Sequence, residues 1–205
     1  PYSFDVSGDA DATNATKQNS RELAIESMKS TCRVKRVEEI RLNRADYLLR
    51  YTRDLTIAVV EAKAAYKLPG DGLQQAKSYA EILGLKFAYA TNGHGIVEFD
   101  YIKGKETQLD SFPRPAELWQ RLRIGEGLEN DEIAARALTP SDTSIGKASR
   151  YYQEIAINKT VQAILKEDNR ILLTMATGTG KTVVAFQICW KLWSMRWNRS
   201  GEYRR

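Results

Sequence analysis

Two carboxylates and a lysine occur at spacings that suit metal-assisted phosphodiester chemistry. Residues 46–63 read DYLLRYTRDLTIAVVEAK, which places Asp46 at the start and Glu61 and Lys63 at the end. Because side chains alternate along a strand, Glu61 and Lys63 point to the same face. The carboxylates offer hard oxygen ligands to Mg²⁺, and the ammonium can position a water or neutralise charge that develops on a phosphate. These groups predict phosphodiester hydrolysis with Asp46 and Glu61 as metal ligands.

The segments around the polar break at residues 52–54 predict a β-hairpin. Apolar runs at residues 47–51 and 56–60 form its strands and would bring Asp46 alongside Glu61. Asp54 is the rival first carboxylate, but it falls in the predicted turn, where aspartate is common. A surface strand with chance charges is the alternative, since E-x-K alone is a weak signal. Charges at the end of a buried run favour a functional site.

The order of an aspartate, a hairpin and E-x-K resembles the PD-(D/E)xK nuclease motif. A helix predicted over residues 73–83 adds Gln75 and Tyr79, which lie four residues apart on one face. A Q-x-x-x-Y pair after E-x-K is similar to that of one branch of these nucleases, which includes the restriction subunits of type I enzymes. The resemblance implies that Gln75 and Tyr79 reach the DNA backbone or the lysine; two surface side chains are the alternative.

A second motif predicts nucleotide binding. Residues 169–182 read NRILLTMATGTGKT, in which a predicted strand runs into a glycine-rich loop, and a helix is predicted over residues 183–193. Such a loop turns backbone N–H groups towards phosphates, and the helix N-terminus adds partial positive charge. Lys181 would reach the β- and γ-phosphates of ATP, and Thr182 would ligate Mg²⁺. The rest of the predicted phosphate-binding loop is Thr177, Gly178, Thr179 and Gly180.

The form ATGTGKT resembles motif I of superfamily 2 helicases, in which Met175 can stand where the general pattern has glycine. Residues 151–153, at the start of a helix predicted over residues 151–166, resemble the Q motif of such helicases. The resemblance implies that Gln153 binds adenine; an amphipathic helix that only packs is the alternative.

No Walker B carboxylate follows motif I, and three tryptophans crowd the last helix and the residues after it, Trp190, Trp193 and Trp197. We therefore expect an incomplete RecA-like domain, an N-terminal piece of a larger protein, and little steady-state ATP turnover.

The remaining pattern predicts an α/β fold. Expected elements are a helix at 21–30 that carries Glu22 and Glu26, strands at 33–42, 86–91 and 96–102, a loop at 69–72, a helix at 116–123 and a short helix near 132–137. The strand–helix–strand order predicts a parallel pair. We expect a flexible segment at 1–19, a nuclease domain at 20–123 with a restriction-endonuclease-like mixed sheet flanked by helices, a linker at 124–147, and an incomplete RecA-like P-loop domain at 148–205.

Composition adds broad limits. The 205 residues carry a net charge of +5, a mild basic excess that fits a polyanionic partner. Cys32 and Cys189 lie in unlike contexts and predict reduced thiols in a cytoplasmic protein. No membrane span and no signal peptide are expected. Pro1 suggests an incomplete or processed N-terminus. His94, in a glycine-rich turn, is expected to be a turn residue.

Together the motifs resemble the N-terminal part of the restriction subunit of a type I restriction–modification enzyme. The resemblance implies ATP-dependent translocation of double-stranded DNA, Mg²⁺-dependent cleavage, and partnership with modification (methyltransferase) and specificity subunits. The alternatives are a P-loop helicase with a non-cutting DNA-binding domain, another nuclease–helicase fusion in DNA repair, and an interaction scaffold with accidental motifs.

Overall fold

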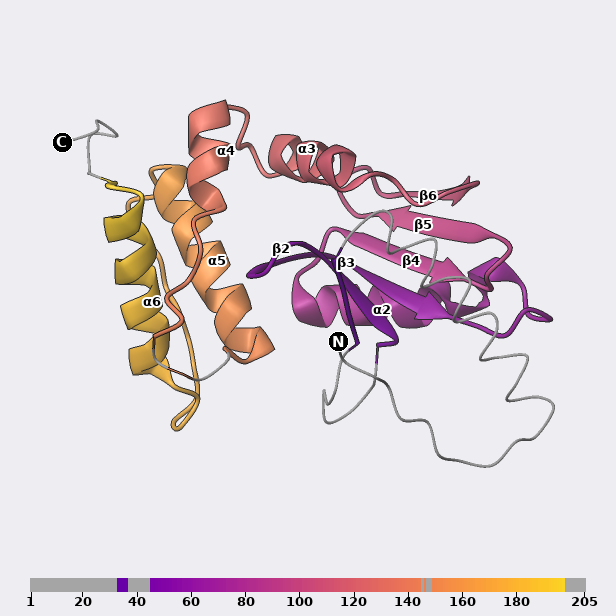
Figure 1. Ribbon diagram of the computed structural model, residues 1–205, viewed down its shortest axis with the longest axis horizontal. Helices are drawn as coiled ribbons and strands as arrows, with labels where there is room; N and C mark the ends of the chain where they lie inside the picture. Colours follow the sequence, from indigo (N-terminus) through magenta and orange to yellow (C-terminus); the bar gives the residue numbers. More distant parts are fainter. Residues whose placement is uncertain (1–32, 37–44, 145, 147–148, 198–205) are drawn as a thin grey trace.

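The computed structural model describes residues 33–36, 45–144, 146 and 149–197 (Figure 1). The predicted segment at 1–19, the helix predicted at 21–30 with Glu22 and Glu26, and Cys32 lie outside these ranges. So does the second half of the strand predicted over residues 33–42.

The described residues form a six-stranded mixed sheet in the order β1-β2-β3-β4-β5-β6. β3 pairs with β4 in parallel, and every other neighbouring pair is antiparallel. The predicted hairpin and the predicted parallel crossover are therefore both confirmed. The strands are β1 Arg33–Arg36, β2 Tyr47–Thr52, β3 Leu55–Ala62, β4 Phe87–Thr91, β5 Ile96–Asp100 and β6 Lys105–Leu109.

Helices cover both faces of the sheet. α2 Leu73–Leu83 packs Ala76, Tyr79 and Ala80 against Val59 of β3, so it covers one face. α3 Pro115–Gly125 covers the other face through a core that includes Val60, and Ala134 of α4 Asp131–Ala137 joins that core. The adjacent residues Val59 and Val60 thus belong to opposite cores, as the alternation of a strand requires. α2 ends at Gly84, whose φ of +63° suits a glycine cap.

A pair of helices lies beside the turn of the β2–β3 hairpin (Figure 1). α5 Tyr151–Leu165 and α6 Lys181–Ser194 share a core with α4, in which Ile157, Val161 and Val184 are buried. The predicted helices at 116–123, 132–137, 151–166 and 183–193 are confirmed with shifts of one or two residues at their ends. None of the described helices is long and apolar enough to cross a membrane.

Two predictions were wrong, and one strand was missed. Residues Pro69–Gly72, expected to be a loop, form a 3₁₀ helix, η1. The edge strand β6 was not predicted, because its polar sequence KETQL is mostly exposed and has no apolar alternation. The predicted strand at 169–175 has no ladder partner among the described residues, and its Leu172 is 92% exposed. A strand exists only through such a partner, so an apolar sequence alone does not form one.

Candidate functional sites

The β3 strand directs the E-x-K residues towards α2. Val59, Glu61 and Lys63 are two residues apart, so they lie on the face that packs against α2. On α2 itself, Tyr79 is buried against Val59 while Gln75 is exposed. The alternation of side chains along β3 and the helical repeat of α2 therefore bring the E-x-K and Q-x-x-x-Y residues to the same place.

A chain of hydrogen bonds joins the two motifs. Lys63 Nζ donates to Glu61 Oε1 at 2.9 Å and to Gln75 Oε1 at 2.8 Å. Gln75 Nε2 donates in turn to the Tyr79 hydroxyl at 2.7 Å. Tyr79 is only 3% exposed, so its hydroxyl has a fixed position. It orients the Gln75 amide, which in turn orients the Lys63 ammonium.

Asp46 joins this group, whereas Asp54 does not. Asp46 Oδ2 accepts a hydrogen bond of 2.9 Å from the backbone N–H of Ala62, between the two E-x-K residues. Asp54 lies at the turn of the hairpin, where its Oδ2 accepts from the backbone N–H of Ser141 at 2.8 Å. Of the two candidates weighed from the sequence, only Asp46 is beside Glu61.

Glu61 occupies an unusual electrostatic position. It is 4% exposed, and its Oε2 accepts no hydrogen bond from any described donor. Burial raises the pKa of the Glu61 carboxyl above its ordinary value of 4.5, the hydrogen bond from Lys63 opposes that shift, and the neighbouring Asp46 carboxylate reinforces it. Two acidic side chains, Asp46 and Glu61, therefore lie side by side, and no donor among the described residues reaches Glu61 Oε2. A divalent cation between them would satisfy both.

Two residues that sequence reasoning missed shape this site. A Cβ on Gly72 would lie 2.9 Å from Glu61 Cγ and 3.0 Å from Lys63 Cε, so the glycine leaves room for both side chains. Asn92, 6% exposed, donates to the Lys67 carbonyl at 2.8 Å and accepts from the backbone N–H groups of His94 and Gly95. The G-D-G and N-G-H-G sequences signalled turns, but they did not reveal these contacts. His94 lies in the turn between β4 and β5, as predicted, and is exposed.

The predicted phosphate-binding loop lies between α5 and α6. Gly178 and Gly180 have φ of +77° and +84°, values that suit glycine. The helix begins at Lys181, whose Nζ donates to the Met175 and Ala176 carbonyls at 3.1 and 3.3 Å. Thr179 Oγ1 donates to the Ala176 carbonyl at 2.6 Å. Thr177 and Thr182 are exposed, so the loop offers its hydroxyls and its backbone on the surface.

Gln153 fastens this loop to α5. Its Nε2 donates to the Thr179 carbonyl at 2.8 Å, and its Oε1 accepts from the Arg150 N–H at 2.9 Å. A Cβ on Gly180 would lie 2.5 Å from Gln153 Nε2, so the second glycine admits the amide. The structure thus brings Gln153 to the loop, and adenine recognition by Gln153 stays a prediction.

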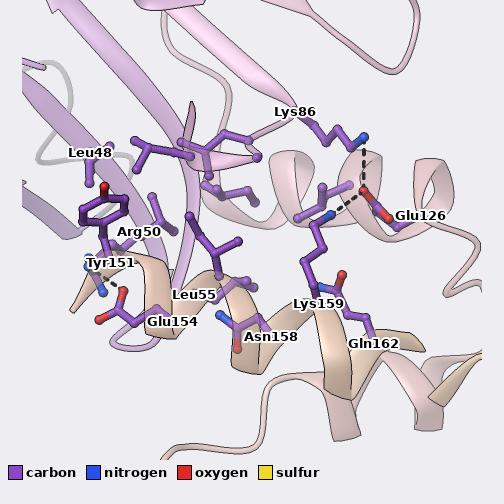
Figure 2. Close-up of a pocket in the computed structure, with 17 residues that line it drawn as sticks. Leu48, Arg50, Leu55, Lys86, Glu126, Tyr151, Glu154, Asn158, Lys159 and Gln162 are labelled. Atoms are coloured by element: carbon purple, nitrogen blue, oxygen red, sulfur yellow. Dashed lines mark hydrogen bonds and ion pairs between the residues drawn. The ribbon is translucent and has the colours of Figure 1, made fainter. Parts of the chain in front are cut away.

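A cavity of about 70 Å³ lies elsewhere, between the sheet and α5 (Figure 2). Arg50 pairs with Glu154 across it at 3.0 Å, and Glu126 pairs with Lys86 at 3.5 Å and Lys159 at 3.3 Å. None of the predicted site residues lines this cavity. We therefore treat it as part of the contact between the two halves of the chain and not as the reactive centre.

Comparisons with known proteins find relatives of this chain. Residues 147–200 match a family model described as the type III restriction enzyme, res subunit. The type I restriction enzyme EcoAI endonuclease subunit of Escherichia coli is 39% identical over 187 residues, which are 88% of this chain and 23% of that protein. The EcoKI endonuclease subunit of Escherichia coli strain K12 is 34% identical over 120 residues, 53% of this chain and 10% of that protein.

A solved structure extends the comparison to the fold. It is described as a fragment of an HsdR subunit of a type I restriction enzyme from Vibrio vulnificus YJ016, is 56% identical and superposes with a TM-score of 0.75. The match covers 86% of this chain and 34% of the other. This chain spans less than a quarter of the length of either curated relative. With 39% and 56% identity over most of its own length, it belongs to the family of type I restriction enzyme endonuclease subunits and corresponds to a part of one.

Proposed function

We propose that Asp46, Glu61 and Lys63 hydrolyse phosphodiester bonds of double-stranded DNA with Mg²⁺. The observation that carries the proposal is the buried Glu61 carboxylate, which faces Asp46 and has no described hydrogen-bond donor at its Oε2. A buried carboxylate left unsatisfied costs about 1–3 kcal/mol or more, so a site built this way is explained best by a ligand that the carboxylate binds.

The donor set fits Mg²⁺. The described residues contain no group of three or more His, Cys, Asp or Glu side chains that would hold a metal, so protein ligands alone do not fill a coordination sphere. Mg²⁺ keeps several waters and needs only one or two carboxylates, which Asp46 and Glu61 would supply. When bound, it would polarise the phosphate and lower the pKa of a ligand water.

The lysine would act on the phosphate. Held by Glu61 and Gln75, Lys63 Nζ has a fixed position beside the carboxylates, where it would neutralise charge on the phosphoryl oxygens or orient the attacking water. Gln75 and Tyr79 would keep the ammonium in place. In this proposal the Q-x-x-x-Y pair serves the lysine and does not itself contact the DNA.

The phosphate loop would bind ATP with Mg²⁺. Lys181 and Thr182 stand at the start of α6, and Gln153 braces the loop. The relatives are named as endonuclease subunits of type I restriction enzymes. We therefore propose that the whole protein couples ATP-driven translocation of double-stranded DNA to cleavage, together with modification and specificity subunits.

Calorimetry tests the nuclease assignment. Mn²⁺ is titrated into the wild-type chain, into Glu61→Ala and into Glu106→Ala, which removes an exposed carboxylate on β6. The same samples are then assayed for plasmid nicking. We expect Glu61→Ala to lose Mn²⁺ binding and nicking while Glu106→Ala keeps both. Equal Mn²⁺ binding by wild type and Glu61→Ala would reject the metal site and favour a non-cutting DNA-binding domain beside the phosphate loop.

A further inference from the structure

The segment that follows β3 presents large apolar side chains to solvent. Tyr66 is 70% exposed and Leu68 is 72% exposed, and Lys67 between them is also exposed. Single exposed apolar residues are ordinary on a protein surface, but two that flank a lysine on one short loop form a local feature. We call residues 64–68 the rim loop.

The rim loop and the 3₁₀ helix η1 together connect two points of the candidate nuclease site. The rim loop begins immediately after Lys63, and η1, which follows it, ends at Gly72, against the Glu61 and Lys63 side chains. Tyr66 is three residues from Lys63, so its Cα lies within roughly 11 Å of the Lys63 Cα. Whatever phosphate Lys63 contacts, the nucleotides next to it would pass within reach of the rim loop.

Hydrogen bonds hold the backbone of the rim loop in place. Asn92 Nδ2 donates to the Lys67 carbonyl at 2.8 Å, the Lys67 N–H donates to the Ala64 carbonyl at 2.9 Å, and the Leu68 N–H donates to Asp71 Oδ2 at 3.2 Å. These bonds hold the backbone of the loop, so little backbone freedom is lost when Tyr66 and Leu68 bind a ligand, which favours recognition.

We propose that the rim loop is a DNA-contacting element of the nuclease site. Tyr66 and Leu68 pack against sugars or bases next to the scissile phosphate, and Lys67 contacts a neighbouring phosphate. An aromatic face stacks on any base and a lysine binds any phosphate, so this contact strengthens binding without reading sequence. The inference rests on the proposed nuclease function, because it takes DNA as the substrate that lies at Lys63.

DNA binding by the full chain tests the inference. The affinity for a fluorescein-labelled duplex is measured by anisotropy in EDTA, where no metal-dependent cleavage takes place, at several salt concentrations. We expect Tyr66→Ala and Leu68→Ala each to weaken binding about tenfold, and Tyr66→Phe to restore it. Lys67→Ala should reduce the slope of log K against log salt by about one phosphate contact.

Matched controls separate a DNA contact from a loss of structure. Ile82→Ala removes an apolar side chain, 54% exposed, at the other end of α2, and Lys103→Ala removes an exposed lysine on the β5–β6 turn. Both should bind DNA within about twofold of wild type. Mn²⁺ affinity, measured by calorimetry on the rim-loop variants, should not change, because the metal ligands are untouched.

The outcomes distinguish failure of the rim-loop inference from failure of the nuclease proposal. Wild-type DNA affinity in Tyr66→Ala and Leu68→Ala overturns the rim-loop inference, even if Glu61→Ala abolishes cleavage and the nuclease proposal stands. Weakened affinity in these variants supports DNA contact by the rim loop. If Glu61→Ala also still nicks plasmid, the nuclease proposal fails, and with it the role of the loop beside a scissile phosphate. A wild-type chain that does not bind the duplex at any salt concentration overturns the rim loop outright.

Discussion

Single residues set the geometry of the candidate nuclease site, and Gly72 does so by leaving room for the Glu61 and Lys63 side chains. Its φ of −91° is open to any residue, so the effect of a side chain there is steric. We predict that Gly72→Ala displaces Glu61 and Lys63, weakens Mn²⁺ binding at least tenfold and costs about 1–3 kcal/mol of unfolding free energy. Calorimetry and urea unfolding measure the two effects.

Gly70→Ala is the control for this substitution. A Cβ on Gly70 would meet only Val97 Cγ2, at 3.9 Å, which is ordinary van der Waals contact. Gly70→Ala should therefore bind Mn²⁺ as the wild type does. If both alanine variants behaved alike, crowding of Glu61 and Lys63 would not be the cause.

Gln75 offers a second prediction about single residues. Its side chain forms hydrogen bonds with Lys63 and Tyr79, so its loss should free the lysine without removing either proposed metal ligand. We expect Gln75→Ala to slow DNA cleavage about tenfold to a hundredfold while Mn²⁺ affinity stays unchanged. The neighbouring exposed Gln74 on the same helix provides the matched Gln74→Ala control. Equal cleavage rates in the two variants would remove Gln75 from the site.

The residues with recognisable chemistry were predictable, and the residues that make room for them were not. Spacing alone placed Glu61, Lys63, Gln75 and Tyr79 on facing surfaces, because periods of two and of 3.6 fix side-chain direction. Gly72 and Asn92 act through contacts with segments that are distant in sequence, and no local period encodes such contacts. Their roles became visible only in three dimensions.

At the scale of elements, the strength of the local pattern decided which predictions held. The β2–β3 hairpin, α2 and the parallel β3–β4 pair have apolar repeats matched to their structure, and all were predicted. β6 is polar and mostly exposed, and it exists because its backbone pairs with β5. The segment at 169–175 has the opposite property, an apolar sequence without a partner strand in the described part of the chain.

The prediction at the scale of elements concerns Asn92, which links two segments of the chain. Its side chain ties the turn between β4 and β5 to the rim loop. We expect Asn92→Ala to lower the unfolding free energy by about 1–3 kcal/mol, measured by urea denaturation, because it leaves three part-buried backbone groups without their partner. Asn92→Asp keeps the acceptor for His94 and Gly95 but loses the donor to Lys67. Asn92→Asp should therefore weaken DNA binding through the rim loop and leave the β4–β5 turn largely intact.

His94→Ala is the control, because His94 lies in the same turn and its side chain is exposed. It should leave the unfolding free energy within about 0.5 kcal/mol of wild type. Equal losses in His94→Ala and Asn92→Ala would show that the turn itself, and not the Asn92 side chain, sets the stability.

At the scale of the whole molecule, polar contacts join the sheet to the α5–α6 pair. Asn158 Nδ2 donates to the Asp54 carbonyl at 2.8 Å, and Glu126 accepts from Lys159 and Lys166 at 3.3 and 3.4 Å. Burial opposes the shift, but the surrounding lysines hold the pKa of the Glu126 carboxyl below its usual value. These partners lie tens of residues apart along the chain, so the sequence predicted the helices and strands on both sides without predicting how they join.

The prediction for the whole molecule concerns the ionisation of Lys191, which lies where the sheet meets the α5–α6 pair. It lies on α6, the helix that begins at the phosphate loop, and is 2% exposed. Its Nζ donates to Asn158 Oδ1 at 3.2 Å. Burial lowers the pKa of the Lys191 ammonium below its ordinary value of 10.5, although the Asp54 and Glu154 carboxylates oppose the shift. Lys191→Met keeps the length of the side chain and removes the charge.

The sign of the expected effect follows from proton linkage. Below the lowered folded-state pKa, the lysine is charged in both states, and the wild type bears the full cost of burying the ammonium. Between that pKa and 10.5 the unfolded chain binds more protons than the folded chain, so wild-type stability rises with pH relative to Lys191→Met. Urea unfolding of both proteins at pH 7, 8, 9 and 10 measures this difference. The exposed-site control Lys103→Met should give a flat difference, and a flat or falling difference for Lys191→Met would mean that burial does not perturb this ammonium.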